Sequence, residues 1–162
     1  MGEEKQLQTL DIEEQEAIGR AVVMMVKNAP MIAKRMQIRY ENMALNTLGI
    51  FPQQGTVYLR RYISGAFDGQ YSFFLRIRVK PTSDDQKISE EARLNTIAMW
   101  LEGKPVTYDG KTYQIADYPT LTEGRMIRQI SRASPAFIAS MQDDGTVDYQ
   151  VNLQLQYFRK GN

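Results

Sequence analysis

The chain contains no cysteine and no histidine among its 162 residues. Without cysteine it has no disulfide bond, no thiolate nucleophile and no cysteine-ligated zinc or iron–sulfur site. Without histidine it has no Ser-His-Asp triad, no HExxH helix and no imidazole base that titrates near neutral pH. Catalysis would have to rely on carboxylates, lysine and tyrosine, whose pKa values need arranged neighbours to shift usefully. The composition therefore predicts a protein that is not an enzyme and has no cofactor.

Long apolar runs are also missing, since no segment approaches the roughly 18 to 20 uninterrupted apolar residues that a membrane span needs. The N-terminus, MGEEKQLQTLDIEEQE, is acidic and polar, whereas a signal peptide is basic and then apolar. We therefore expect a protein that stays in the cytoplasm where it is made and contacts no membrane. The length predicts one domain over residues 1–162, with the first ten or so residues disordered.

Charge is nearly balanced, with a formal net charge of +1, so no general attraction to nucleic acid is expected. The charges are segregated, however. Residues 34–80 carry eight bases and two acids, whereas residues 81–123 carry four bases and eight acids. A solvated surface explains such patches, but two opposite patches on one small domain also suit head-to-tail self-assembly.

Two segments have the apolar spacing of amphipathic helices. In residues 11–27, Ile18, Ala21, Val22 and Met25 fall on one face, and Asp11 is placed to cap the N-terminus. The second helix begins at a Ser83 to Gln86 capping box and runs to about residue 102, before Gly103. The acids near each N-terminus complement the helix dipole.

Alternating apolar and polar residues predict strands at 57–63 and 71–79, which form a hairpin, and at 147–157. Weaker signals suggest strands at 36–40, 113–117, 125–131 and 135–141, and residues 41–54 have no clear period. The expected fold class is α+β, a mostly antiparallel sheet of about six strands with two helices packed on one face.

Two groups of residues could be taken for chemical sites. Gly110-Lys111-Thr112 resembles the end of a phosphate-binding loop, but Pro105 stands where that loop needs its first glycine, so a hairpin turn is favoured. Asp84, Asp85, Glu90 and Glu91 could be metal ligands or paired catalytic carboxylates, but acids at a helix start more often form a solvated face.

The order of these elements, the Trp100-Leu101-Glu102 end of the second helix and the terminal hairpin SMQDDGTVDYQVNLQLQYFR resemble the tail-terminator, or tail-completion, proteins of long-tailed bacteriophages, often labelled minor capsid proteins. The resemblance covers residues 50–160, and Asp144, Gly145 and the strand after them carry most of it. Residues 28–54 depart from the pattern. The motifs are patterns of fold rather than of chemistry.

The resemblance implies a structural virion protein that forms a ring, usually a hexamer, at the junction of head and tail after synthesis in the bacterial cytoplasm. Its partners would be copies of itself, the tail tube protein and a head-completion protein, with DNA passing through transiently. It implies no catalytic, cofactor or metal-binding residue. The alternative from another class is a cytoplasmic α+β domain that binds a small ligand or works as an enzyme through tyrosine and carboxylates.

Two sets of residues follow as hypotheses for such a ring. A polar row that does not grip phosphate is expected to face the opening: Gln150, Asn152, Gln154 and Gln156. Oppositely charged side chains are expected at the subunit contact: Arg60, Arg61, Arg76, Arg78 and Lys80 against Asp84, Asp85, Glu90 and Glu91.

Overall fold

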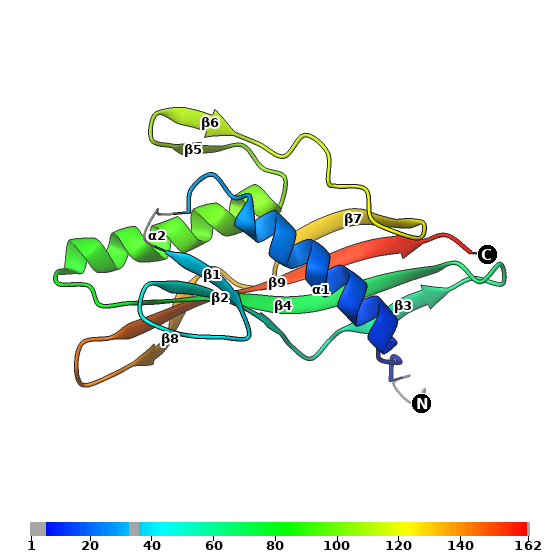
Figure 1. The fold of residues 1–162 in the computed structure, drawn as a ribbon, viewed down its shortest axis with the longest axis horizontal. Coiled ribbons are helices and arrows are strands. Elements are labelled where there is room, and N and C mark those ends of the chain that lie inside the picture. Colours follow the sequence, from blue (N-terminus) through cyan, green and yellow to red (C-terminus); the bar gives the residue numbers. More distant parts are fainter. Residues whose placement is uncertain (1–5, 33–35, 162) are drawn as a thin grey trace, which may run out of the picture.

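The computed structural model describes residues 6–32 and 36–161, which form two helices and nine strands (Figure 1). The helices are α1 (Ile12–Lys27) and α2 (Asp84–Leu101). The strands are β1 (Gln37–Tyr40), β2 (Thr47–Pro52), β3 (Val57–Arg61), β4 (Phe67–Val79), β5 (Val106–Tyr108), β6 (Lys111–Tyr113), β7 (Arg125–Arg132), β8 (Phe137–Met141) and β9 (Val147–Arg159).

Strands β4 and β9 form the centre of the main sheet and pair antiparallel over 13 residues, from Phe67 opposite Arg159 to Val79 opposite Val147. The other edge of β4 is shared by β3 and β2, and β1 adds to β2 in parallel. The other edge of β9 is shared by β7 and β8, while β5 and β6 form a small separate hairpin. The α+β class with a mostly antiparallel sheet is therefore confirmed.

Both helices pack on one face of this sheet, which we call the helix-side face and which carries the odd-numbered side chains of β4 and β9. A Cβ atom on Gly19 of α1 would lie 3.2 Å from the Tyr71 hydroxyl, so α1 packs closely on β4. Helix α2 contacts β9, and its residues Leu94, Ile97 and Leu101 are buried in the same core as Tyr149, so α2 covers the other half of the same face. The opposite face, with the even-numbered side chains, is the polar face.

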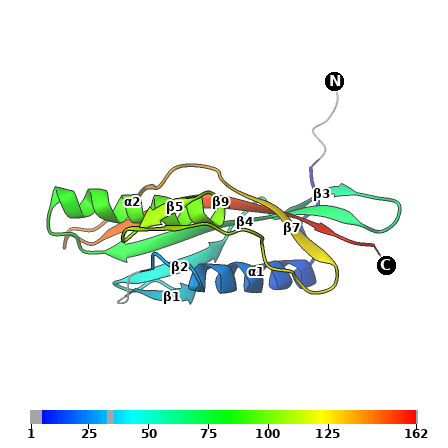
Figure 2. The ribbon, with the colours of Figure 1, turned by 90° about the horizontal axis from the view of Figure 1, so that it is seen from above.

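The alternation in β9 has the predicted orientation. The apolar row from Val147 to Tyr157 is buried in the core, and the polar row from Asn152 to Gln156 is partly exposed. Figures 1 and 2 show the result, a long twisted sheet from which the β3–β4 hairpin projects at one end. The C-terminal segment lies beside this hairpin, because a Cβ on Gly161 would collide with the Ser64 carbonyl oxygen.

The predicted helix starts are confirmed, with different capping contacts. The Ser83 hydroxyl accepts the Gln86 amide at 3.2 Å, but the Gln86 side chain accepts from the Thr82 amide, one residue before the expected one. Asp11 occupies the N-cap position of α1 without a side-chain hydrogen bond. The Ser83 contact satisfies one of the amides that the first turn of α2 leaves free.

Sequence periodicity missed β2 because that strand has no polar side. Thr47, Leu48, Gly49 and Ile50 are all buried, and a Cβ on Gly49 would lie 2.7 Å from the Asn42 carbonyl oxygen. The loop before β2 therefore covers the side that alternation would leave polar. A strand buried on both faces cannot be recognised by period 2.

Three further expectations need correction. The strand expected at 113–117 is β6, which ends at Tyr113, because Asp109 and Gly110 form a two-residue turn with positive φ (51° and 76°) that pairs residues 106–108 with 111–113. β4 begins at Phe67 rather than at residue 71. The segment before α1 is ordered at residues 8–10, where Leu10 is buried and the Tyr58 amide donates to the Gln8 carbonyl at 2.9 Å.

Candidate functional site

The arginine row and the glutamine row predicted from the sequence lie side by side on the polar face. β4 and β9 pair in register, with Arg76 opposite Gln150 and Arg78 opposite Asp148. The Arg76 guanidinium donates to the Gln150 side-chain oxygen, with Nε at 3.0 Å. The Gln150 amide in turn donates to Asn152 at 2.8 Å. The two rows, predicted separately for the subunit contact and the opening, form one hydrogen-bonded surface.

Arg78 has the strongest partner on this surface. Its guanidinium donates two hydrogen bonds to the Asp148 carboxylate, at 2.8 and 3.0 Å, and the Asp148 side chain is only 3% exposed. The hydrogen bond that Arg78 donates to this buried carboxylate raises the pKa of Arg78. Planar two-point pairing is the geometry in which arginine binds carboxylates best. Arg78 is therefore a structural part of the polar face.

Aromatic rings lie on the same face, beside the middle of the polar row and at one end of it. Phe51 of β2 stacks on Phe74 of β4, which lies opposite Asn152, with centroids 4.9 Å apart, and the Arg76 guanidinium lies 5.1 Å from the Phe74 ring centre. At the end of the row the Arg128 guanidinium lies 5.2 Å from the Phe158 ring centre. The cations on this face thus rest on rings or pair with amides and a carboxylate, contacts that fix their orientation.

The acidic helix lies on the opposite face. Asp84 and Asp85 form the first turn of α2, and Glu90 pairs with Arg93 of the same helix at 2.9 Å. Within the described residues, no ion pair joins Asp84, Asp85, Glu90 or Glu91 to the five bases of the predicted contact. The acids and the arginines of β4 therefore present opposite charge on two sides of one sheet.

The remaining predicted bases are dispersed. Arg61 covers the Tyr58 ring at 3.9 Å and donates to Gln8, whereas Arg60 lies 5.9 Å from the Tyr62 ring centre. Lys80 follows β4 near the β8–β9 turn, where a Cβ on Gly145 would lie 3.8 Å from its Cε. Lys34 and Arg35, two of the eight bases in residues 34–80, fall outside the described residues. The structure does not gather these bases into a single patch.

Sequence reasoning missed a buried ionic cluster beside the helix-side face. Glu14 of α1 is 2% exposed, and its carboxylate accepts from Arg125 at 2.7 and 2.9 Å and from the Tyr157 hydroxyl at 2.9 Å. Arg159 also donates to it. The cluster joins the start of α1 to β7 and to the end of β9, segments more than 100 residues apart in the sequence.

The cluster holds Glu14 ionised. Burial by itself would raise the pKa of Glu14, but hydrogen bonds from Arg125 and Tyr157 and the charges of Arg125 and Arg159 outweigh it and lower the pKa below its usual value. Burial, and then Glu14, raise the pKa of Tyr157, so its hydroxyl keeps its proton and donates. The sequence showed an acid at position 14, which we interpreted as a residue that complements the helix dipole.

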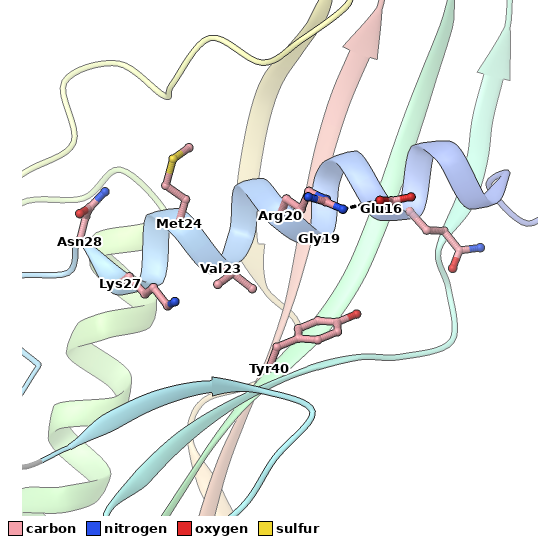
Figure 3. Close-up of a pocket in the computed structure, with 9 residues that line it drawn as sticks. Glu16, Gly19, Arg20, Val23, Met24, Lys27, Asn28 and Tyr40 are labelled. Atoms are coloured by element: carbon pink, nitrogen blue, oxygen red, sulfur yellow. Dashed lines mark hydrogen bonds and ion pairs between the residues drawn. The ribbon is translucent and has the colours of Figure 1, made fainter.

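A groove runs along the outer side of α1 (Figure 3). Its volume is about 600 Å³, and its lining includes Val23, Met24 and Lys27 of α1 and Tyr40 of β1. Figure 3 shows Val23 pointing toward Tyr40 and Met24 pointing away from it. Met24 and Tyr40 are about half exposed. Glu16 and Arg20, which pair with each other, lie further along the helix. The groove therefore has apolar walls and charged ends.

Comparison with protein-family models gave no match, and neither did a search of curated proteins. In residues 6–32 and 36–161, no group of three or more acidic side chains is placed to hold a metal ion. The same part of the chain contains no helix that is both long enough and apolar enough to cross a membrane.

Proposed function

We propose that the protein is a structural subunit that assembles head to tail into a ring, as a tail terminator joining a bacteriophage tail to its head. One observation carries the proposal: the two faces of a single sheet present different surfaces, a hydrogen-bonded arginine and glutamine face and a helix layer that begins with acids. A subunit with two different faces can present one face to the opening of a ring and the other to its outside, while neighbouring copies meet head to tail.

The polar face suits the opening of such a ring. Gln150, Asn152, Gln154 and Gln156 carry no charge, and the two arginines beside them are already bound to Gln150 and Asp148. Each free cation on a channel wall adds a phosphate contact and strengthens the grip on DNA. Cations that are already hydrogen-bonded to other side chains hold DNA less tightly, so DNA can pass such a wall. We therefore place the arginine row and the glutamine row at the opening of the ring, with the helices outside.

The test is the assembly state of the purified protein. Light scattering after size-exclusion chromatography is expected to show oligomers whose fraction rises with concentration, and electron microscopy is expected to show rings with a central opening. A monomer at every concentration would contradict the proposal and favour the ligand-binding or enzymatic alternative.

Charge reversal at the start of α2 is expected to weaken assembly. Asp85 is exposed and forms no ion pair within the described residues, so Asp85→Lys changes the surface charge without breaking an internal contact. We expect at least a tenfold higher dissociation constant, and weaker wild-type assembly when salt is raised from 50 to 500 mM, because exposed charges are screened beyond a Debye length of about 10 Å at 0.1 M.

The matched control is Asp117→Lys, an equal charge change at an exposed residue between β6 and β7. It should assemble like the wild type. Equal loss of assembly in both variants would show that net charge, and not the α2 acids, controls association.

A further inference from the structure

We propose that neighbouring copies join by strand addition, with β8 of one copy pairing antiparallel to β1 of the next and its apolar side chains filling the groove beside α1. This contact rests on the self-association proposed above and names its surfaces. It follows from four features of the molecule: an apolar edge strand, a second edge with a groove, matching side-chain faces and opposite charge at one end.

The apolar edge is β8, with the sequence FIASM. It pairs with β9 on one side only, and within the described residues its backbone makes no hydrogen bond outside that ladder. Ile138 is 46% exposed and Met141 is 61% exposed. Natural edge strands are usually protected by charge, proline or a covering segment, and β8 has neither charge nor proline. An edge of this kind is a template for another strand.

The receiving edge is β1, at the other end of the strand order β1-β2-β4-β9. It pairs only with β2 among the described strands. The two remaining edges are less open. The N-terminal segment pairs with β3 through Thr9 and Val57, and Thr120 bridges to Met126 of β7. The sheet thus offers β8 on one side and β1 on the other.

The side chains of the two edges match by face. Ile138 lies opposite Tyr149, and Met141 lies opposite Val147, so both belong to the helix-side face. The bulge between Ile138 and Ser140 brings these two residues, three apart in sequence, to the same side. On β1, Ile38 lies beside Leu48 and Tyr40 beside Ile50, also on the helix-side face.

An added strand would therefore place Ile138 and Met141 next to Ile38 and Tyr40, where the groove lies between α1 and β1. The apolar side chain of Val23, which points toward Tyr40 (Figure 3), is then covered. Apolar side chains opposite each other on neighbouring strands stabilise a sheet, and the burial removes exposed apolar area from water.

Direction and charge agree with this pairing. β8 runs antiparallel to β9, β9 runs antiparallel to β4, and β4 runs antiparallel to β2. Because β1 is parallel to β2, β8 and β1 run in opposite directions within one copy. Copies related by rotation about an axis along the strands keep these directions, so the contact is antiparallel. It brings the β8–β9 turn, with Asp143 and Asp144, to the start of β1, where Lys27 lines the surface.

The absence of cysteine makes a direct test possible. In the double variant Ile38→Cys/Met141→Cys the two thiols lie on opposite edges of the sheet, so no disulfide can form within one copy. Oxidation of the assembled protein is expected to give a ladder of covalent dimers, trimers and larger species on a non-reducing gel. Ile38→Cys/Ile138→Cys tests the neighbouring register. The control pair is Ile38→Cys/Ile63→Cys, because Ile63 is fully exposed at the β3–β4 hairpin and away from both edges.

A second variant avoids dependence on disulfide geometry. Ile138→Asp is expected to raise the dissociation constant of the assembly at least tenfold with an unchanged melting temperature of the monomer, whereas Ile63→Asp leaves assembly unchanged. If wild-type rings form but neither cysteine pair gives a ladder and Ile138→Asp assembles normally, the strand contact is wrong and the ring function stands. If the wild type is monomeric throughout, both are wrong.

Discussion

Replacing Glu14 by alanine is expected to reduce the free energy of unfolding by about 3 to 5 kcal/mol, the usual result of removing one partner of a buried ion pair. Arg125 is 2% exposed and would lose its two hydrogen bonds to the carboxylate, and the Tyr157 hydroxyl would lose its acceptor. Urea unfolding at pH 7, followed by circular dichroism, measures the loss.

The control is Glu16→Ala, two residues along the same helix. Glu16 pairs with Arg20, and both side chains are more than half exposed, so its loss should cost less than about 1 kcal/mol. Similar losses for the two variants would contradict the role of the Glu14 cluster and point to a general effect of helix composition.

The same residue makes stability depend on pH in the acid range. Because the folded structure lowers the pKa of Glu14, the stabilisation is complete above its ordinary pKa near 4.5 and is lost as pH falls through the lower folded value. The difference in unfolding free energy between the wild type and Glu14→Gln should therefore be constant from pH 7 to about 5 and shrink at lower pH. A difference that grows on acidification would contradict this assignment.

Replacing Leu155 by alanine is expected to cost about 2 to 5 kcal/mol, as deletion of a fully buried leucine side chain usually does. Leu155 is fully buried, between Tyr71 of β4 and Ile130 of β7. Such a loss is a large part of the stability of an ordinary domain. Thermal unfolding of the wild type and the variant measures it.

The neighbouring Gln154 provides the matched control, because its side chain lies on the polar face and is partly exposed. Gln154→Ala should change the free energy of unfolding by less than about 0.5 kcal/mol. Any effect of Gln154 should appear in ring assembly. Equal melting losses from the two variants would mean that the faces of β9 are reversed.

Much of the fold was predictable where neighbouring residues decide the structure. The spacing of Ile18, Val22 and Met25 predicted α1, the Ser83 capping box predicted the start of α2, and the alternation in 147–157 predicted which side of β9 is buried. The hairpin turn expected at Gly110-Lys111-Thr112 also exists, and the structure places it at Asp109 and Gly110, whose residue types favour positive φ. These signals are local, because helix and strand periods depend on residues a few positions apart.

The candidate site was predicted less well because it depends on pairing between distant segments. The sequence predicted the arginine row of β4 and the glutamine row of β9 as separate features, 70 or more residues apart. Only the register of β4 with β9 showed that Arg76 meets Gln150 and Arg78 meets Asp148. A shift of one residue would have moved either row to the other face.

The sequence by itself determined the two helices, the faces of β9 and the absence of histidine and cysteine chemistry, because composition and short-range periodicity settle these. Tertiary structure alone decided that Glu14 is a buried ion-pair partner and not a surface acid, since Arg125 and Tyr157 reach it from more than 100 residues away. It also decided which strands lie at the open edges of the sheet, β1 and β8, because strand order is set by burial of the whole apolar face and not by any one segment.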